Sequence, residues 1–574
     1  RQESSKQHWN RWHLSPRMPW RHDARTLGSQ PEAGDHGPGE GPQLPLLLLD
    51  MLNGSLLPGT SSDRSWYPAR LALLRAGSRL PVNELRWPSV DGGPWDGSCR
   101  VRLRGTTSSS FPKHQWSVRT LRGGAVNSVG GLDSESLMAA FGPRWRMDDS
   151  FVLQGPYADK TLLRNAFMYA TSNAMGMWAP HTLFVELHTR DLTGSRYVGV
   201  YIVMEQVTAQ RLCLLSSPCN SDGAFEHDGF SAARGARVPA IPNQFGFLAQ
   251  CDHFGKHPDK HYVLRWGATA FSLVWPSDDC SHSGCLSSRM AVILGGALGA
   301  DGMPDLSHVD MESFADYLIL QELSGNVDGY LFSVYLQRAS AGLLRAGPIW
   351  DFNIALGNCD YSVIANDSRL TLHHWSWARD QSVLQRFYRR LLTTCFNSSP
   401  VVWEGQVLAR YFADRWRWHR ERALSDDALH GRAWAFARLL IESGAAERNF
   451  DVWPLGTYVW PNVDTPVSYK GEVEVMLEWL RSRVTWLDGA FAELGELHPG
   501  QRWCPPPWHS VSSSHFPPVE GSTSTVALAP AVASCLVIGL ASVVAIKCAR
   551  RASVRRRGAG GSEPSDGGYC SLAS

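Results

Sequence analysis

The sequence has almost no net charge, with 55 lysines and arginines against 54 aspartates and glutamates. A nucleic-acid-binding surface needs a basic excess, so this balance argues against nucleic acid as a partner. The chain also lacks a P-loop and a dinucleotide-type glycine fingerprint. It has no G-x-S-x-G motif, which argues against a serine hydrolase but excludes only one fold of that class.

Cysteine never occurs as a C-x-x-C pair, which argues against a tetrathiolate zinc site. The close pairs Cys213/Cys219 and Cys280/Cys285 instead predict small loops closed by disulfides. Disulfides are typical of an oxidising compartment. Connectivity cannot be deduced from spacing alone.

Residues 208–300 are rich in Cys, His and Gly and predict an irregular insert. Four side chains there suggest zinc as an alternative, namely Cys251, His253, His257 and His261. However, Gly255 and Pro258 interrupt the helix that would align the histidines, and no nearby glutamate completes a metalloprotease motif. We therefore favour an insert without zinc.

A run of about twenty uncharged residues, Val526–Ile546, is long enough to span a bilayer. Basic residues follow it directly, which predicts a cytoplasmic tail over 547–574 and places the rest of the chain outside the cytosol. A buried core helix is the alternative. Residues 499–525 are rich in Pro and Ser and predict a stalk, whereas residues 1–43 are polar and predict a disordered arm. These features predict a single-pass type I membrane protein.

Two further observations bear on this topology. Three N-glycosylation sequons, at Asn53, Asn366 and Asn397, all fall on the predicted outer side. No signal peptide is visible, and the chain begins at Arg1 without Met, so we expect a processed or truncated start.

The first part of the main domain predicts strands. Leu44–Leu49 and Ser65–Arg75 are strand-like, and Cys99–Arg104 alternates apolar and basic residues as a half-buried strand does. The glycine- and hydroxyl-rich turn Gly105–Ser110 follows. Its backbone amides and hydroxyls suit a phosphate, whose charge Lys113 would neutralise, although flexible turns have the same composition.

A helix is predicted after Asp159, which is a good N-cap residue. Lys160 and Arg164 lie four residues apart and would share one face of that helix, pointing either at phosphate or at solvent. Thr182–Thr189 and Tyr197–Val207 predict a strand pair. Glu205, near the end of that pair, would either pair with a phosphate-binding lysine or lie exposed at an edge.

The central segment 326–358 contains two apolar, strand-like runs with the turn Ala341-Gly342 between them, which predicts a hairpin. Asp328 and Asp351 flank these runs, so a hairpin would bring the two carboxylates together at one end. Magnesium prefers oxygen ligands and holds phosphates through one or two carboxylates. The pair therefore fits a nucleotide site, and the alternative is two solvated turn aspartates. A helix is predicted over Met311–Leu323, and helical patterns continue after residue 383.

Four ordered blocks in this chain resemble those of the CotH-type kinases, the spore-coat protein-kinase family. WDFNIALGN resembles the family's WDxDxxxG signature, and the upstream Asn-Val-Asp at 326–328 resembles its acidic motif. The other blocks are RLRGTTSSSFPKHQW (102–116), YADKTLLRN (157–165) and YVGVYIVMEQV (197–207). The resemblance extends over roughly residues 44–498.

This resemblance implies an α+β, atypical protein-kinase-like domain with a β-rich N-terminal part and a helical C-terminal part, followed by the transmembrane helix. It implies transfer of the ATP γ-phosphoryl, with Mg²⁺ or Mn²⁺, to Ser or Thr of secreted or surface proteins. Asp328 matches the catalytic acid and Asp351 the metal-holding acid. The phosphate-binding candidates are Arg104, Lys113, Lys160 and Arg164.

Two departures from the family pattern leave a second class of function open. Asn353 stands where the signature often has a second aspartate, and Ser333 stands where many members carry an asparagine. An amide oxygen still ligates magnesium but brings no charge. The alternative to an enzyme is a non-catalytic surface adhesin or receptor that keeps the fold.

Overall fold

The structure is a computed structural model. It describes residues 43–52, 64–74, 95–120, 149–214, 246–254, 262–276, 286–359, 374–394, 400–456 and 468–498, apart from 268, 301, 341 and 379–380, together with the single residues 57, 145, 459, 501, 503 and 504. All of them belong to the first of two units, Arg1–Trp508. No helix in this described part is long and apolar enough to cross a membrane. The predicted arm and span, most of the predicted stalk and the tail lie outside it.

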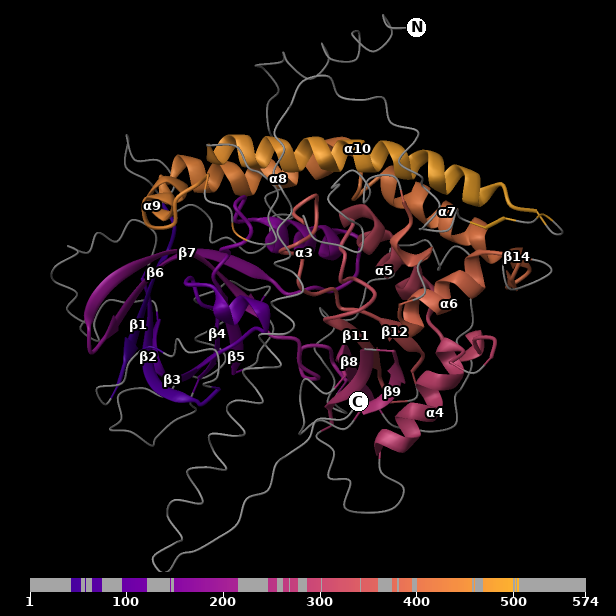
Figure 1. Cartoon of the computed structure of the whole chain (residues 1–574), viewed down its shortest axis with the longest axis horizontal. Helices are drawn as coiled ribbons and strands as arrows, with labels where there is room; N and C mark the ends of the chain where they lie inside the picture. The colour runs from indigo at the N-terminus through magenta and orange to yellow at the C-terminus, as the bar shows by residue number, and fades with distance from the viewer. Residues whose placement is uncertain are drawn as a thin grey trace, which may run out of the picture. The chain divides into compact units, whose positions relative to one another are not determined.

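Seven strands close into a barrel in the order β1-β2-β3-β4-β5-β7-β6 (Figure 1). Their bounds are Leu46–Met51, Tyr67–Leu74, Trp95–Leu103, Trp116–Thr120, Ser150–Gln154, Thr182–Asp191 (β6) and Gly194–Glu205 (β7). Side chains alternate across a strand, so Val101 and Leu103 fill the barrel while Arg102 lies on its outer side. The predicted strands here, including the β6–β7 pair, are confirmed.

A second sheet has the order β12-β11-β8-β10-β9. Strands β11 (Val334–Arg338) and β12 (Leu344–Ala346) pair antiparallel, which confirms the predicted central hairpin. The other edge of β11 pairs with β8 (Phe247–His253), and β10 (Thr269–Trp275) and β9 (Tyr262–Trp266) extend the sheet beyond it.

The prediction that residues 208–300 are irregular is therefore wrong for much of the stretch. It contains β8, β9, β10 and the helix α4 (Leu286–Leu298). The strand pattern in the sequence was weak because these strands are only five to seven residues long. Segments rich in Cys, His and Gly also separate them. β8 packs between β11 and β10, so this segment is part of the sheet that carries the central hairpin.

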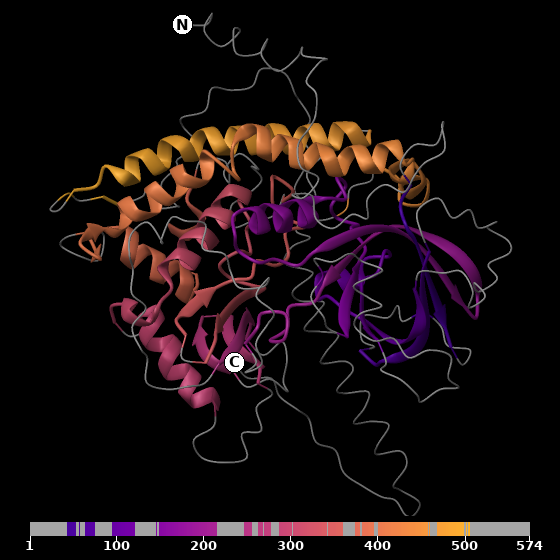
Figure 2. The same ribbon diagram turned by 180° about the vertical axis from the view of Figure 1, so that it is seen from behind.

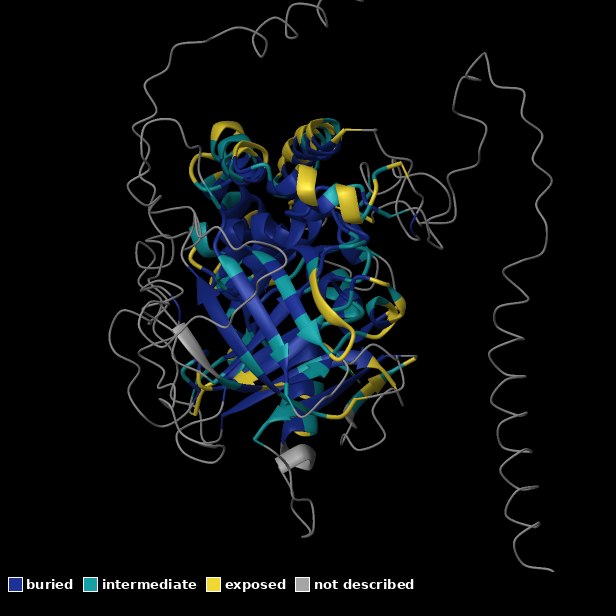
Figure 3. Cartoon of the chain, turned by 90° about the vertical axis from the view of Figure 1, so that its left-hand side faces the viewer, coloured by how far each residue is buried: buried dark blue, intermediate teal, exposed yellow. Residues whose placement is uncertain are grey.

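Helices dominate the C-terminal part, as expected (Figure 2). They are α5 (Met311–Ser324), α6 (Val383–Leu392), α7 (Leu408–Arg420), α8 (Asp426–Glu442), α9 (Ala445–Val452) and α10 (Tyr469–Gly495), with the short hairpin β13 (Val402–Trp403) and β14 (Gln406–Val407) before α7. The earlier helix α3 (Arg164–Ala174) lies between β5 and β6 in the chain. One core joins these helices to the outer face of β7, where Val200, Ile202 and Met204 are buried. Figure 3 shows that the buried residues run through both the strands and the helices. The α+β class and its order along the chain are confirmed.

Helix α5 leads directly into the segment that carries Asp328. Its N-cap Asp310 accepts a hydrogen bond from Ser313 N, and it ends at Gly325, whose φ of 55° is left-handed and suits glycine. Near its end, Glu322 forms a wholly buried ion pair of 2.8 Å with Arg483 of α10. The same carboxylate accepts from Ser376 N, Trp377 N and Tyr330 Oη. A buried pair of this kind is expensive to break, so the end of α5 is rigidly held.

Candidate active site

The loop that follows α5, residues 326–333, carries Asp328. The Asp328 carbonyl accepts from Leu331 N and Phe332 N at 2.8 and 2.9 Å, so the loop coils back on itself. Tyr317 Oη of α5 donates to Gly329 O at 2.6 Å. A Cβ at Gly329 would lie 2.1 Å from Gln321 Oε1, so only glycine lets the loop approach α5 this closely. The half-buried Asp328 is thus placed by α5.

Asn326 joins the two acidic residues that the sequence singled out. Its Oδ1 accepts from Asp328 N at 3.2 Å, and its Nδ2 donates to Asp351 O at 3.3 Å. One buried side chain therefore bonds the backbones of both acidic residues, whereas the closeness of their carboxylates stays a prediction. Asp351 itself has a positive φ of 66° and donates its N–H to Tyr169 Oη at 3.2 Å. Non-glycine residues rarely adopt this conformation, and it is often found at functional sites.

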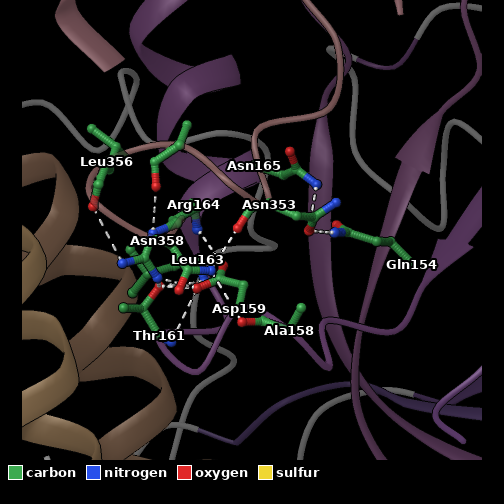
Figure 4. A network of polar contacts seen from close by, with 11 residues as sticks. Gln154, Ala158, Asp159, Thr161, Leu163, Arg164, Asn165, Asn353, Leu356 and Asn358 are labelled. Carbon is green, nitrogen blue, oxygen red and sulfur yellow. Dashed lines mark hydrogen bonds and ion pairs between the residues drawn. The ribbon is translucent and has the colours of Figure 1, made fainter. Parts of the chain in front are cut away.

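Asn353 lies beside Asp351. Gln154 and Asn165 hold its amide in one orientation (Figure 4). Asn165 Oδ1 accepts from Phe352 N at 2.6 Å, so its Nδ2 faces Asn353 Oδ1 at 3.3 Å. Gln154 Nε2 donates to the same oxygen at 2.6 Å. The Asn353 amide group consequently donates to Asp351 Oδ1 at 2.7 Å. Its oxygen points away from Asp351, so metal ligation by that oxygen would require the amide to rotate.

Arg104 approaches Asp351 from the end of β3. Its Cζ lies 5.3 Å from the centroid of the Trp350 ring, and its Nη1 is buried without a hydrogen-bond partner. Burial lowers the pKa of Arg104, while Tyr335, Asp351 and Tyr169 act in the opposite direction. A half-buried cation with an unused buried donor suits an anionic ligand at this position.

Lys113 is buried and contacts a distant part of the chain. Its Nζ donates to Asn449 Oδ1 of α9 at 2.7 Å and lies 5.3 Å from the Tyr201 ring. Burial, and then the like charge of Lys160, lower the pKa of Lys113 well below its ordinary value, with Asp159 acting the other way. Lys113 lies in the loop after the serine-rich turn, but that turn uses the hydroxyls of Ser109 and Ser110 to bond its own backbone.

The position of Asn449 explains why residue 199 is a glycine. A Cβ at Gly199 would lie 2.6 Å from Asn449 Oδ1, which also accepts from Val200 N at 3.1 Å. Helix α9 can therefore reach both the barrel and Lys113 only because residue 199 lacks a side chain. Asn449 lies outside the blocks quoted from the sequence and was not predicted.

The expected shared helical face of Lys160 and Arg164 is wrong, because α3 begins only at Arg164. Both side chains are buried, so the alternative of a solvated surface is also wrong. Asp159 accepts from Arg164 N at 2.9 Å and pairs with Arg164 Nη1 at 2.5 Å. Arg164 Nε also donates to Ala355 O at 3.0 Å (Figure 4). Arg164 thus ties the 157–164 segment to the loop after Asp351.

Lys160 suits the predicted phosphate-binding role better than Arg164 does, because Arg164 is already paired with Asp159. Its Nζ is 4.9 Å from the Tyr157 ring, and it forms no ion pair within 4.0 Å among the described residues. Burial lowers its pKa, and the nearby Glu472 and Asp159 oppose that effect. An anion bound near Lys113 and Lys160 would relieve two poorly solvated charges.

Glu205 does not take either expected arrangement. It is wholly buried, which excludes the exposed edge position, and its carboxylate contacts His181 Nδ1 at 2.8 Å and Arg211 Nε at 3.5 Å. Neither Lys113 nor Lys160 pairs with it. Burial would raise the pKa of Glu205, but His181 and Arg211 outweigh burial and lower it. Its visible role is to hold the end of β7.

The zinc alternative gains no support within the described part of the chain, where no group of three His, Cys, Asp or Glu residues could hold a metal ion. Cys251 is a buried free thiol in β8, and burial raises its pKa to about 12. His257 and His261 lie outside this part. Cys213 and Cys504 are disulfide-bonded. Because Cys219, Cys280 and Cys285 are not described, the two loop pairings stay predictions.

Comparison with models of known protein families identifies this chain's family. The family model described as CotH kinase protein matches residues 101–216 and 306–487, together more than half of the chain. Asp328, Asp351 and all the phosphate-binding candidates lie inside these ranges. The unmatched interval between them contains β8, β9, β10 and α4. No curated protein matches the chain.

Proposed function

Because the chain belongs to the CotH kinase family, which suggests an ATP-dependent protein kinase, we propose that it transfers the ATP γ-phosphoryl group to Ser or Thr of secreted or surface proteins. The observation that carries this proposal is the Asn326 bridge between Asp328 and Asp351. Phosphoryl transfer needs one group that orients the attacking hydroxyl and another that holds metal and phosphate. Two acidic residues whose backbones are joined by Asn326 would supply both groups.

We assign the roles as follows. Asp328, half-buried and held by α5, accepts or orients the acceptor hydroxyl proton. Arg104, with its unused buried donor near Asp351, binds phosphate oxygens. Lys113 and Lys160 neutralise the remaining phosphate charge. Positioning and charge stabilisation supply nearly all of the catalysis in this reaction class, so fixed geometry matters more than covalent chemistry.

The residues around Asp351 fit a divalent cation only in part. The half-buried carboxylate suits Mg²⁺ or Mn²⁺, which usually binds through one or two carboxylates together with phosphates and water. Asn353 presents its NH₂ group to that carboxylate rather than its oxygen. A bound ion would neutralise charge on the phosphates. We expect Asp351 to hold it and Asn353 to contribute little.

The orientation of Asn353 also favours a second candidate, a non-catalytic adhesin or receptor with the same fold. Incubation of the full-length chain with γ-labelled ATP, Mg²⁺ or Mn²⁺ and a Ser-rich acceptor separates the two. The kinase transfers label and loses transfer in Asp328→Asn. An adhesin transfers none and binds partner cells regardless of that substitution.

We also propose that residues 526–546 anchor the chain, with the kinase-like domain luminal or extracellular and residues 547–574 in the cytosol. The uncharged run and its basic flank support this topology. Protease added to sealed cells or vesicles of native orientation should spare only the span and tail. Protection of the 44–498 region would contradict the proposal.

A further inference from the structure

Asn449 of helix α9 holds Lys113 without neutralising its charge. The helix lies against β7 (Figure 1), where Asn449 Oδ1 accepts from Val200 N at 3.1 Å and from Lys113 Nζ at 2.7 Å. No carboxylate of the described residues lies within 4.0 Å of Lys113 Nζ. An amide oxygen directs an ammonium group but brings no negative charge. Because Lys113 and Asn449 are both buried, water does not supply the missing compensation.

The NH₂ end of the Asn449 amide is unused. Two donors contact Oδ1, so exchanging O and N would place donors against donors, and the orientation of the amide is fixed. Nδ2 is buried and has no hydrogen-bond partner in the described part of the chain. An unpaired buried donor costs stability. A ligand oxygen at this position would remove that cost.

Tyr469, the first residue of α10, supplies a second buried donor of this kind. Its Oη has no hydrogen-bond partner within the residues that the structure describes. Its ring packs on Phe450 of α9, with centroids 5.8 Å apart. Burial, and then the charge of Asp159, raise the pKa of Tyr469 well above its ordinary value. The hydroxyl therefore stays protonated at neutral pH and can donate.

These donors gather around the Asp159 carboxylate. Its charge raises the pKa of three side chains from different segments, namely Lys113, Lys160 and Tyr469. Asp159 is itself already paired with Arg164, which bonds the loop after Asp351. Glu472 of α10 is the other carboxylate that acts on Lys160. Lys113 and the two neutral donors thus keep most of their capacity for an anion.

We propose that α9 and α10 complete the phosphate-binding site of this chain. Asn449 positions Lys113 and donates its own NH₂ group, and Tyr469 donates its hydroxyl, to a phosphate that the two lysines attract. A phosphate group offers several strong acceptor oxygens and the negative charge that these groups lack. The inference rests on the proposed kinase function only for naming the ligand as ATP, whereas phosphate binding itself does not.

Two substitutions of Asn449 separate this role from a structural one. Asn449→Ala removes the oxygen that holds Lys113, whereas Asn449→Asp keeps that oxygen and adds a negative charge. A purely structural Asn449 predicts that aspartate restores whatever alanine loses. We expect both variants to bind ATP with Mg²⁺ at least about tenfold more weakly than the parent. Calorimetry on the full-length chain measures this, with the melting temperature as the check on folding.

Tyr469→Phe tests the α10 donor without adding or removing charge. It deletes a hydroxyl that has no partner in the fold, so the melting temperature should not fall, while ATP affinity should fall about three- to tenfold. Tyr388→Phe is the matched control, because Tyr388 Oη donates to Phe314 O at 2.8 Å inside the core. It should melt at a lower temperature and bind ATP as the parent does.

The same titrations with inorganic pyrophosphate separate this inference from the kinase proposal. A parent that binds pyrophosphate but not ATP, with weaker binding in Asn449→Asp and Tyr469→Phe, supports the phosphate site and leaves the kinase proposal to fail alone. ATP binding at parental strength in either variant overturns the inference and leaves the kinase proposal standing. If Asn449→Asp does not fold, Tyr469→Phe still decides. A parent that binds neither ligand overturns both.

Discussion

The Asn353 side chain donates a hydrogen bond of 2.7 Å to Asp351 Oδ1. Gln154 and Asn165 hold the amide in this orientation by donating to its oxygen. The amide therefore occupies a carboxylate oxygen of Asp351 that a bound cation would otherwise contact. Because this hydrogen bond competes with a metal ion for Asp351, it should weaken metal binding there.

Replacing Asn353 by aspartate should make stability depend on magnesium. The new carboxylate would lie against Asp351, and two like charges so close repel unless a cation lies between them. We expect Asn353→Asp to melt about 2–4 °C below the parent in EDTA and to gain more from Mg²⁺ than the parent does. Differential scanning fluorimetry with and without Mg²⁺ measures both effects.

Asn353→Ala is the control for that experiment, because it removes the same hydrogen bond without adding charge. It should lose stability in EDTA but show no larger response to Mg²⁺ than the parent. An Asn353→Asp variant that is indifferent to Mg²⁺ would mean that Asp351 does not face a cation site.

Gly329→Ala should damage turnover while sparing nucleotide binding. Its Cβ would meet Gln321 Oε1 at 2.1 Å and Cδ at 2.7 Å, so either the buried Gln321 side chain or the Asp328 loop must move, and we expect the loop to move because Gln321 is confined in α5. Displacement of a catalytic group by about 1 Å can cost on the order of a hundredfold. We expect kcat to fall at least tenfold with ATP affinity nearly unchanged. Gly489→Ala, on α10 where nothing lies within 4 Å of the new Cβ, should leave both unchanged.

The buried Asp316 should make the protein lose stability in acid. Burial would raise its pKa, but His419 and Arg415 outweigh burial and lower it to about 2. A carboxyl with a depressed folded pKa contributes stability above its unfolded pKa of about 3.9, and that contribution is lost as the pH falls toward 2. We expect roughly 2–3 kcal/mol to disappear over this window.

Asp316→Asn should be less stable than the parent at neutral pH, because it removes one of the two carboxylates that pair with the buried Arg415 and leaves only Glu312. Its loss of stability between pH 4 and pH 2 should also be smaller. Denaturant unfolding at several pH values measures both. Asp488→Asn, which removes a half-exposed partner of Arg420, is the control and should retain the acid transition.

Nucleotide binding should take up protons through Lys113. Burial and Lys160 depress its pKa, so part of the population is neutral at a lower pH than for an ordinary lysine. A phosphate near Nζ favours the charged form, so binding should absorb protons above that pKa, and ATP affinity should fall as pH rises through it. Calorimetry at pH 8 in buffers of different ionisation enthalpy measures this uptake. The same uptake in Lys113→Met would contradict the assignment.

Strands and turns could be predicted from the sequence, whereas side-chain contacts between residues far apart in the chain could not. Alternation predicted Val101 and Leu103 inside a strand, and turn residues predicted the hairpin, because both signals lie within a few positions. The partner of Lys113 lies 336 residues away. Arg164 contacts Ala355, 191 residues away, so its structural role could not be read from a helical face. The closeness of the Asp328 and Asp351 backbones could be anticipated because both residues flank the hairpin, and Asn326 joins these backbones.

Calorimetric titration of ATP with Mg²⁺ into the full-length chain tests the central claim most directly. The account predicts Mg²⁺-dependent binding in the parent, its loss in Asp351→Ala, and its retention in Asp328→Asn, which should nevertheless lose roughly a hundred- to ten-thousand-fold in phosphoryl transfer. Folded parent protein that binds no ATP with either Mg²⁺ or Mn²⁺ would contradict the kinase account.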